Sequence, residues 1–210
     1  MNNRKQIVVV LSVFIFSVIV HLKGITSPLL DFHSWRQTQT AMMSRNYYEN
    51  GFRFFHPQID FAGADSYKRA GTEFPAFSFI VAELYKVFGQ HDFLGRFVSV
   101  FFSACGAVYL FFLIKKFLNF WPAYISALVF CVIPVKIYFT RTVQPESLML
   151  FSTIAGIYYF LSYLETPSNK KKIIASCVLL SIAPLVKLPS LYVMIPVFWL
   201  AWKKIRKKSF

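Results

Sequence analysis

One stretch decides the topology of this protein: KKKIIASCVLLSIAPLVKLPSLYVMIPVFWLAWKKIRKK, residues 170–208. Its apolar part, residues 173–202, lies between two clusters of basic residues and is interrupted around Lys187. Cytoplasmic segments carry the excess of Lys and Arg, so both clusters belong on the same side of a membrane. One helix crossing once would separate them. We therefore predict two short spanning helices, 173–186 and 188–202, with a turn at Lys187.

Four further apolar runs are long enough to cross a bilayer as helices, at about 1.5 Å per residue. They cover residues 6–22, 93–114, 117–139 and 145–164. Counting crossings from a cytoplasmic N-terminus places the basic clusters at Arg4/Lys5, Lys115/Lys116 and 170–172, and the basic tail 203–210, on the cytoplasmic side. We predict an all-α, polytopic transmembrane protein with about six spanning helices. Residues 1–210 would form a single membrane domain.

Composition excludes a soluble domain, and the residues that flank the apolar runs disfavour two other interpretations. Hydrophobic residues make up 56% of the chain and charged residues 15%, whereas a soluble domain has about 25% charged residues. The net charge of +14 does not indicate a nucleic-acid-binding protein, because the bases flank apolar runs. The first run also resembles a signal peptide, but His21-Leu22-Lys23-Gly24 follows its apolar part in place of a small-residue cleavage site.

The extended polar region of the chain is residues 23–92, which holds seven of the nine acidic residues. On the topology above it is an outer loop, and we predict two interfacial helices in it, over Ser34–Asn50 and Phe74–Phe88. The same topology places the turns around Arg141 and Lys187 on the outer side. We expect five charged residues to converge there on one site. They are Asp31, Glu73, Arg141, Glu146 and Lys187.

Several motifs resemble those of a known family. The main one is DFHSWRQTQTA, residues 31–41, followed by RNY, residues 45–47. The supporting matches are Glu73-Phe74-Pro75, Gly89 with Gly95-Arg96, Arg141 with residues 145–149, and Lys187-Leu188-Pro189. In this order they resemble the N-terminal part of GT-C fold glycosyltransferases of family 39, which are related to protein O-mannosyltransferases and to the lipid A aminoarabinose transferase. The resemblance implies transfer of a sugar from a polyprenyl-phosphate donor to an acceptor outside the membrane.

Such a transfer needs a base for the proton of the acceptor hydroxyl. The resemblance implies a carboxylate of the first outer loop, and Asp31 is the candidate base; its alternative role is an N-cap of the following helix. Glu73 is the second catalytic candidate, as an acid, a base or an orienting group, and its alternative is a solvated loop carboxylate. Related enzymes often have an acidic residue before the Thr-Ala pair, where this chain has Gln39.

The transfer also needs positive charge for the departing phosphate. Arg36 and Lys187 are the candidates, since Arg binds phosphate through two hydrogen bonds and Lys acts as a point charge. Arg141 and Glu146 are further candidates for substrate binding, and the alternative is that they form an ion pair with each other. His33 is assigned to substrate binding, because no second His or Cys stands at metal-ligand spacing and we expect no metal.

The resemblance implies no cofactor other than the polyprenyl-phosphate sugar, which is the donor substrate. The expected partners are this lipid-linked donor, a glycan, lipid or protein acceptor, and membrane lipids, with no nucleic acid. The topology above places both termini in the cytoplasm, and the resemblance implies the inner membrane with an active site on the periplasmic side. Relatives are generally longer than this chain. The alternative function is therefore a truncated or split non-catalytic module that binds a lipid-linked sugar or a partner transferase subunit, with a C-terminal complementing subunit.

Overall fold

The computed structural model describes residues 3–30, 33–60 and 73–206, which form helices and their connections. The prediction of an all-α polytopic membrane protein is confirmed. The elements are α1 (Asn3–His21), α2 (Ser34–Asn50), α3 (Ala76–Phe88), α4 (Asp92–Lys115), α5 (Phe120–Val132), α6 (Pro134–Thr140), α7 (Glu146–Glu165), α8 (Lys170–Val186), the 3-10 helix η1 (Leu188–Val193) and α9 (Met194–Arg206).

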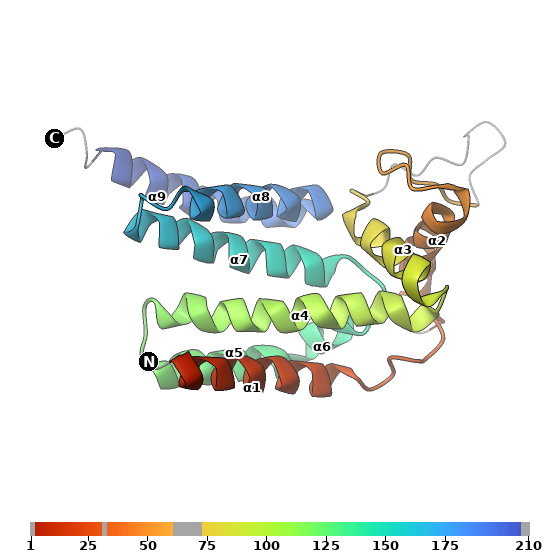
Figure 1. Cartoon of the computed structure of the whole chain (residues 1–210), viewed down its shortest axis with the longest axis horizontal. Coiled ribbons are helices and arrows are strands. Elements are labelled where there is room, and N and C mark those ends of the chain that lie inside the picture. The colour runs from red at the N-terminus through yellow and green to blue at the C-terminus, as the bar shows by residue number, and fades with distance from the viewer. Residues whose placement is uncertain (1–2, 31–32, 61–72, 207–210) are drawn as a thin grey trace.

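The long helices form an elongated bundle, with α2 and α3 at one end of it (Figure 1). In that view α4 lies between α1 and α5 on one side and α7, α8 and α9 on the other. The packing of α1, α4 and α5 is centred on Phe111, which is fully buried with Val13 and the small residues Ala123 and Ala127. Small residues at such contacts let helix backbones approach closely in a membrane.

Three of the described helices are long and apolar enough to cross a membrane: Arg4–His21, α4 and α7. A fourth crossing is possible if α5 and α6 together form one bent span. The remaining two predicted spans correspond to α8, with 17 residues, and to η1 with α9. The total of six crossings therefore stays a prediction.

The predicted span 117–139 differs from the structure because it is broken. Its two helices, α5 and α6, are bent by 61° relative to each other. Pro134 begins α6, and Ile133 before it has the extended conformation, with ψ 123°. A residue that precedes proline is displaced from the helical region by the proline ring, so the helix ends there. The bend is thus a local consequence of Pro134.

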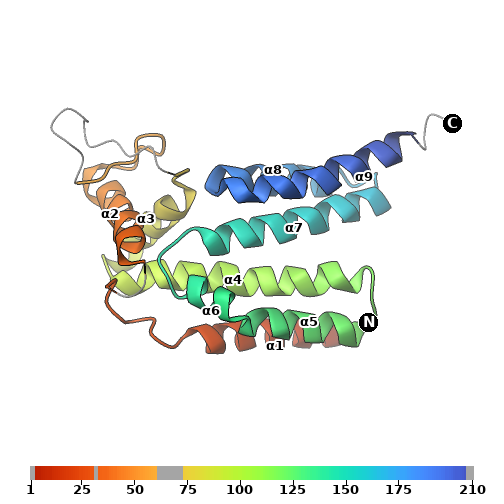
Figure 2. The ribbon, with the colours of Figure 1, turned by 180° about the vertical axis from the view of Figure 1, so that it is seen from behind.

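The chain reverses at Lys187, as the sequence predicted. Lys187 is extended, with φ −153° and ψ 115°, and separates α8 from η1. Figure 2 shows α8 beside α7, and η1 connects α8 to α9. The predicted helix 188–202 begins as a 3-10 helix in the structure and continues as α9, which ends at Arg206.

The helices α2 and α3 are held against the end of the bundle by a hydrophobic cluster and by a buried arginine. Phe77 and Val81 of α3 pack with residues of α4, of the turn after α6 and of α7. Arg96, 1% exposed, donates hydrogen bonds to the carbonyl oxygens of Gly24, Ser27 and Pro28, in the segment between α1 and α2. This end of the molecule is therefore a packed unit.

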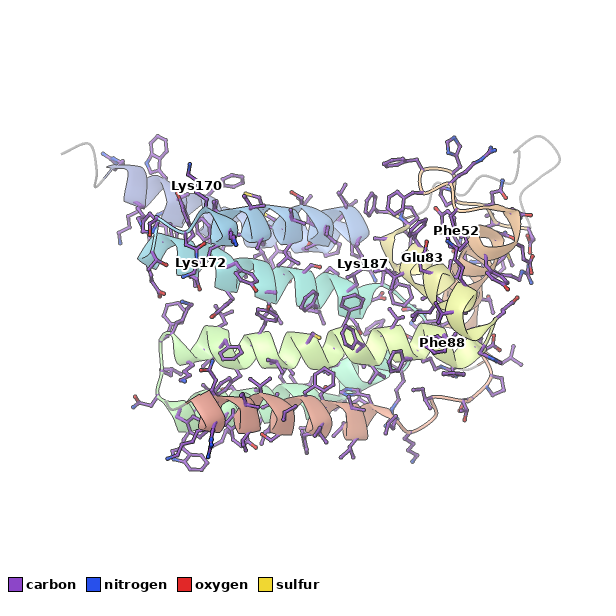
Figure 3. All side chains as sticks on the ribbon, in the orientation of Figure 1. Phe52, Glu83, Phe88, Lys170, Lys172 and Lys187 are labelled. Carbon is purple, nitrogen blue, oxygen red and sulfur yellow. The ribbon has the colours of Figure 1, made fainter. Side chains whose placement is uncertain are left out.

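The opposite end of the bundle collects basic residues. Lys170 and Lys172 lie there, far from Lys187, in Figure 3. Lys116 pairs with Glu165 at 2.7 Å. The N-terminal helix and the last residues of α9 reach the same end in Figure 1. The bundle therefore has one basic end and one end that carries α2, α3 and the turn at Lys187.

Candidate functional site

Two ion pairs from four separate segments meet at the α2/α3 end of the bundle. The guanidinium of Arg36, in the first turn of α2, contacts Glu73 at 2.5 Å. The ammonium of Lys187, in the turn after α8, contacts Glu146, the first residue of α7. The field of Glu146 and of Lys187 acts on Glu73, so the two pairs are neighbours. We call Arg36, Glu73, Glu146 and Lys187 the charge cluster.

Glu73 is the carboxylate that the segment before α3 contributes to the charge cluster, and it is mostly buried. Its side chain is 10% exposed, against 37% for Arg36. Burial raises the pKa of Glu73 above its usual value, because the charged form loses hydration; Arg36 and Lys187 lower the pKa and Glu146 raises it. A carboxyl group with a raised pKa accepts a proton more readily than an ordinary one. The loop position seen in sequence is thus no ordinary solvated carboxylate.

Glu146 is the most buried member of the cluster, with its side chain 9% exposed. One carboxylate oxygen accepts from Lys187, and the other, Oε2, has no hydrogen-bond partner among the described residues. A buried carboxylate oxygen without a donor is costly. A hydroxyl group of a ligand would satisfy it.

His33 joins the cluster through Phe139. The imidazole of His33 lies parallel to the Phe139 ring, with centroids 6.4 Å apart, and the Lys187 ammonium lies 5.9 Å from the centroid of the same ring. His33 has a positive φ of 59°, which is a strained conformation for a residue with a side chain. Such strain persists only where surrounding structure imposes it, and it concentrates at functional sites.

The structure does not place two of the predicted site residues in the charge cluster. Asp31 lies outside the described residues. Arg141 does not pair with Glu146: its guanidinium donates to the carbonyl oxygen of Val20 at the end of α1, at 3.2 Å. The alternative of an Arg141–Glu146 ion pair is not what the structure has: Glu146 pairs with Lys187, and Arg141 reaches Val20.

Two further residues of this site were missed in the sequence. Phe139 is one of many aromatic residues in an apolar run, and no neighbouring residue in the sequence distinguished it as part of a site. Gln37 is fully buried, and its side-chain oxygen accepts a hydrogen bond from the backbone N–H of Val143 at 3.1 Å. This bond fixes the turn before Glu146 to α2. The sequence did contain a signal for Gln37, since it is an amide directly after Arg36 in a helix that was expected to bury one face.

In the part of the chain that the structure describes, no three His, Cys, Asp or Glu side chains gather as metal ligands would. The arrangement instead offers two cations, two buried carboxylates and an aromatic ring. Positive charge of this kind stabilises an anion such as a phosphate, and a buried carboxylate can take up a proton.

Comparison with known proteins gives one match. The family model described as dolichyl-phosphate-mannose-protein mannosyltransferase matches residues 72–210, about two thirds of the chain. The matched part contains Glu73, Glu146 and Lys187. No curated protein and no solved structure matches the chain.

Proposed function

This chain belongs to the dolichyl-phosphate-mannose-protein mannosyltransferase family, and from that premise we propose that it transfers a sugar from a polyprenyl-phosphate donor to an acceptor on the outer side of the membrane. The family is one of membrane glycosyltransferases of the GT-C type, which the apolar helices of this chain fit. The observation that carries the proposal is the charge cluster at one end of the bundle.

The reaction breaks the bond between the anomeric carbon of the sugar and the phosphate oxygen. The phosphate leaves with the bonding electrons, and the acceptor hydroxyl oxygen forms the new bond to the anomeric carbon. The hydroxyl proton goes to a carboxylate. Each event needs one kind of group, namely a base for the proton and cations for the phosphate.

We assign the phosphate to Arg36 and Lys187. Arg36 is 37% exposed and Lys187 is 32% exposed, so both can reach a ligand without being moved out of a core. A phosphate forms strong charge-assisted hydrogen bonds with such groups. It would replace part of their present contact with Glu73 and Glu146.

The base is proposed among the carboxylates of the outer loop, Asp31 and Glu73. The raised pKa of Glu73 supports it, because a base works best when its pKa approaches the working pH. Once the donor phosphate binds Arg36, the Glu73 carboxylate is released to accept the proton.

The proposed orientation follows from the two unlike ends of the bundle. Lys170, Lys172 and the Lys116–Glu165 pair lie at the end opposite to the charge cluster. The positive-inside rule favours the basic end in the cytoplasm. The charge cluster would then face the periplasm, with both termini cytoplasmic in the inner membrane.

The test is incorporation of radiolabelled sugar from polyprenyl-phosphate donors into membranes that contain this chain. The variants are Glu73→Gln, Asp31→Asn and Lys187→Ala. The matched controls are Glu83→Gln, an exposed carboxylate of α3, and Lys23→Ala, an exposed cation. We expect transfer by the unchanged chain and by both controls.

We expect Lys187→Ala to lower transfer at least tenfold and to weaken donor binding. At least one of Glu73→Gln and Asp31→Asn should abolish transfer while the donor still binds. Absence of transfer by the unchanged chain, with donor binding that Lys187→Ala weakens, would instead support the non-catalytic module.

A further inference from the structure

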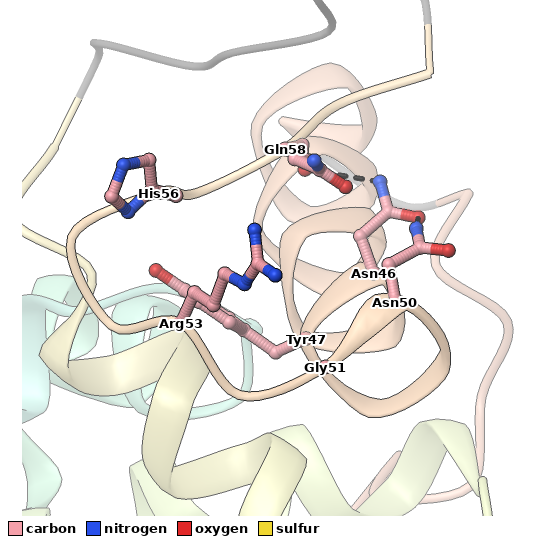
Figure 4. A pocket seen from close by; sticks show the side chains of 7 residues that line it. All are labelled: Asn46, Tyr47, Asn50, Gly51, Arg53, His56 and Gln58. Atoms are coloured by element: carbon pink, nitrogen blue, oxygen red, sulfur yellow. Dashed lines mark hydrogen bonds between the residues drawn. The ribbon is translucent and has the colours of Figure 1, made fainter.

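A second polar pocket lies away from the charge cluster, between the end of α2 and the loop that follows it. It has a volume of about 220 Å³. Figure 4 shows the Arg53 guanidinium extending into this space, with His56 on one side and Asn46 and Asn50 on the other. Neither the family match, which begins at residue 72, nor the proposed reaction uses it.

Two side chains of the pocket are fully engaged and fix its walls. The amide of Asn46 donates to the backbone oxygen of Gln58 and to the carboxylate of Asp60, both at 3.0 Å. The hydroxyl of Tyr47 donates to the backbone oxygen of Phe54 at 2.6 Å. Burial raises the pKa of Tyr47 to about 12, so this donor keeps its proton. The loop is thus bound to α2 at two points.

Three further side chains of the pocket are available to a ligand, whereas the amide of Asn50 donates to the side-chain oxygen of Asn46 at 3.5 Å. No hydrogen bond or ion pair engages the guanidinium of Arg53 or the imidazole of His56 among the described residues, and the side-chain amide of Gln58 is likewise unused. Asp60, a carboxylate of the same loop, is already paired with Arg45. The pocket therefore presents one uncompensated positive charge with amide donors and acceptors beside it.

This combination indicates the chemistry of the occupant. An arginine without a carboxylate partner binds a carboxylate or a phosphate through two parallel hydrogen bonds. Amide side chains bind hydroxyl groups, for which they supply both donors and acceptors. The volume of about 220 Å³ is enough for one sugar ring.

The pocket is also joined to the candidate active site. The ring of Phe54, whose backbone oxygen accepts from Tyr47, packs against Phe74 with centroids 5.4 Å apart. Phe74 is the neighbour of Glu73 in the chain. The loop that forms the pocket therefore contacts the segment that carries Glu73.

We propose that the pocket lined by Asn50, Arg53, His56 and Gln58 binds a sugar unit that bears a carboxylate or phosphate group, as part of the acceptor. That the sugar belongs to the acceptor rests on the proposed transfer function. Sugar binding itself is tested without turnover.

The experiment measures binding of four small probes to the purified chain in lipid nanodiscs. The probes are methyl β-glucuronide, glucose 6-phosphate, neutral methyl β-glucoside and inorganic phosphate. At least one charged sugar should bind ten times more tightly than the neutral sugar and than phosphate alone, and the tighter of the two identifies the anionic group. Equal binding of charged and neutral sugars, equal binding of phosphate alone, or no binding of any probe would overturn the proposal.

Arg53→Gln should weaken binding of the preferred sugar at least tenfold, and Lys23→Gln, which removes an exposed cation of the same outer region, should leave it unchanged. An Arg53→Gln variant that binds like the unchanged chain would overturn the assignment. Glu73→Gln and Asp31→Asn, of which at least one should fail in transfer, should both bind the probe normally. Loss of transfer with intact probe binding thus separates a failure of the proposed reaction from a failure of the pocket.

Discussion

Removal of the Lys187 charge tests the charge cluster most directly. In Lys187→Met the carboxylate of Glu146 stays buried, 9% exposed, and loses its one hydrogen-bond partner. Exposed ion pairs contribute about 0–1 kcal/mol, and loss of one member of a fully buried pair costs about 3–5 kcal/mol. Lys187 is 32% exposed, so the pair lies between these limits. We expect the free energy of unfolding to fall by about 2 kcal/mol.

The same pair predicts an asymmetric mutant cycle. Glu146→Gln leaves Lys187 without its carboxylate, but this ammonium is partly hydrated and retains the Phe139 ring at 5.9 Å. We expect a loss of about 1 kcal/mol, because a solvated cation loses little when its partner is removed. The double variant should also lose about 1 kcal/mol, which corresponds to a coupling energy of about 2 kcal/mol.

The free energies are measured by reversible unfolding of the purified protein in mixed micelles, with Glu83→Gln as a control. Glu83 pairs with Lys86 on the surface of α3, both side chains more than 40% exposed, and its loss should cost about 0.5 kcal/mol or less. Equal losses for Lys187→Met and Glu146→Gln, or a double variant whose loss equals the sum, would refute the reasoning. Equal single losses would mean that Glu146 depends on its partner no more than Lys187 does, and an additive double variant would mean that the two side chains are not coupled.

Three further predictions concern the site and the helices that support it. Transfer should rise with pH through a value above the ordinary Glu pKa, since Glu73 must lose its proton to act as the base. Native stability should fall over the same pH interval, because the carboxyl group of Glu73 holds its proton more tightly in the native than in the unfolded state. A pH profile of transfer or of stability that is unchanged in Glu73→Gln would contradict this. Arg96→Met should cost about 3 kcal/mol or more in unfolding, because three backbone carbonyls lose a charged donor, and an unchanged stability would show that the Gly24–Pro28 segment does not depend on Arg96. Gly156→Ala should lower the free energy of unfolding by about 1–3 kcal/mol, because the new Cβ would lie 2.7 Å from Leu180 Cγ. Gly106→Ala, whose Cβ would lie 3.6 Å from its nearest atom, should lower it much less. Equal effects of the two substitutions would contradict the close approach of α7 and α8.

The helices were predictable where one rule governs a whole segment. The span 145–164 corresponds to α7, and the predicted helix Ser34–Asn50 has the bounds of α2. In both cases apolar length or helical periodicity is a property of the segment itself. The break of the span 117–139 at Pro134 is also local, but a hydropathy average over the run conceals one proline.

The site was predictable as a place and not as a set of contacts. The charge pattern predicted that Glu73, Glu146 and Lys187 converge on one site. In the structure Lys187 pairs with Glu146 and the field of both acts on Glu73, while their role in a site stays a prediction. Which carboxylate pairs with which cation depends on helix rotation and on the path of the turns. Arg141 is five residues from Glu146, yet the bend at Pro134 and the end of α1 bring its guanidinium to Val20. Such pairings follow from tertiary packing, which cannot be predicted from the spacing of residues in the sequence.

Under the proposed function, the pairing of both cations with carboxylates links donor binding to proton removal. Without a ligand, the four charges of the cluster sum to zero, so the buried carboxylates are compensated and the fold tolerates them. A donor phosphate adds negative charge and competes with Glu73 for Arg36. Glu73 then loses the partner that lowers its pKa and gains a negative neighbour that raises it, which strengthens the base at the moment when the sugar is in place. Because this coupling needs the Arg36–Glu73 contact, Arg36→Gln should weaken donor binding and also remove the dependence of the Glu73 pKa on donor.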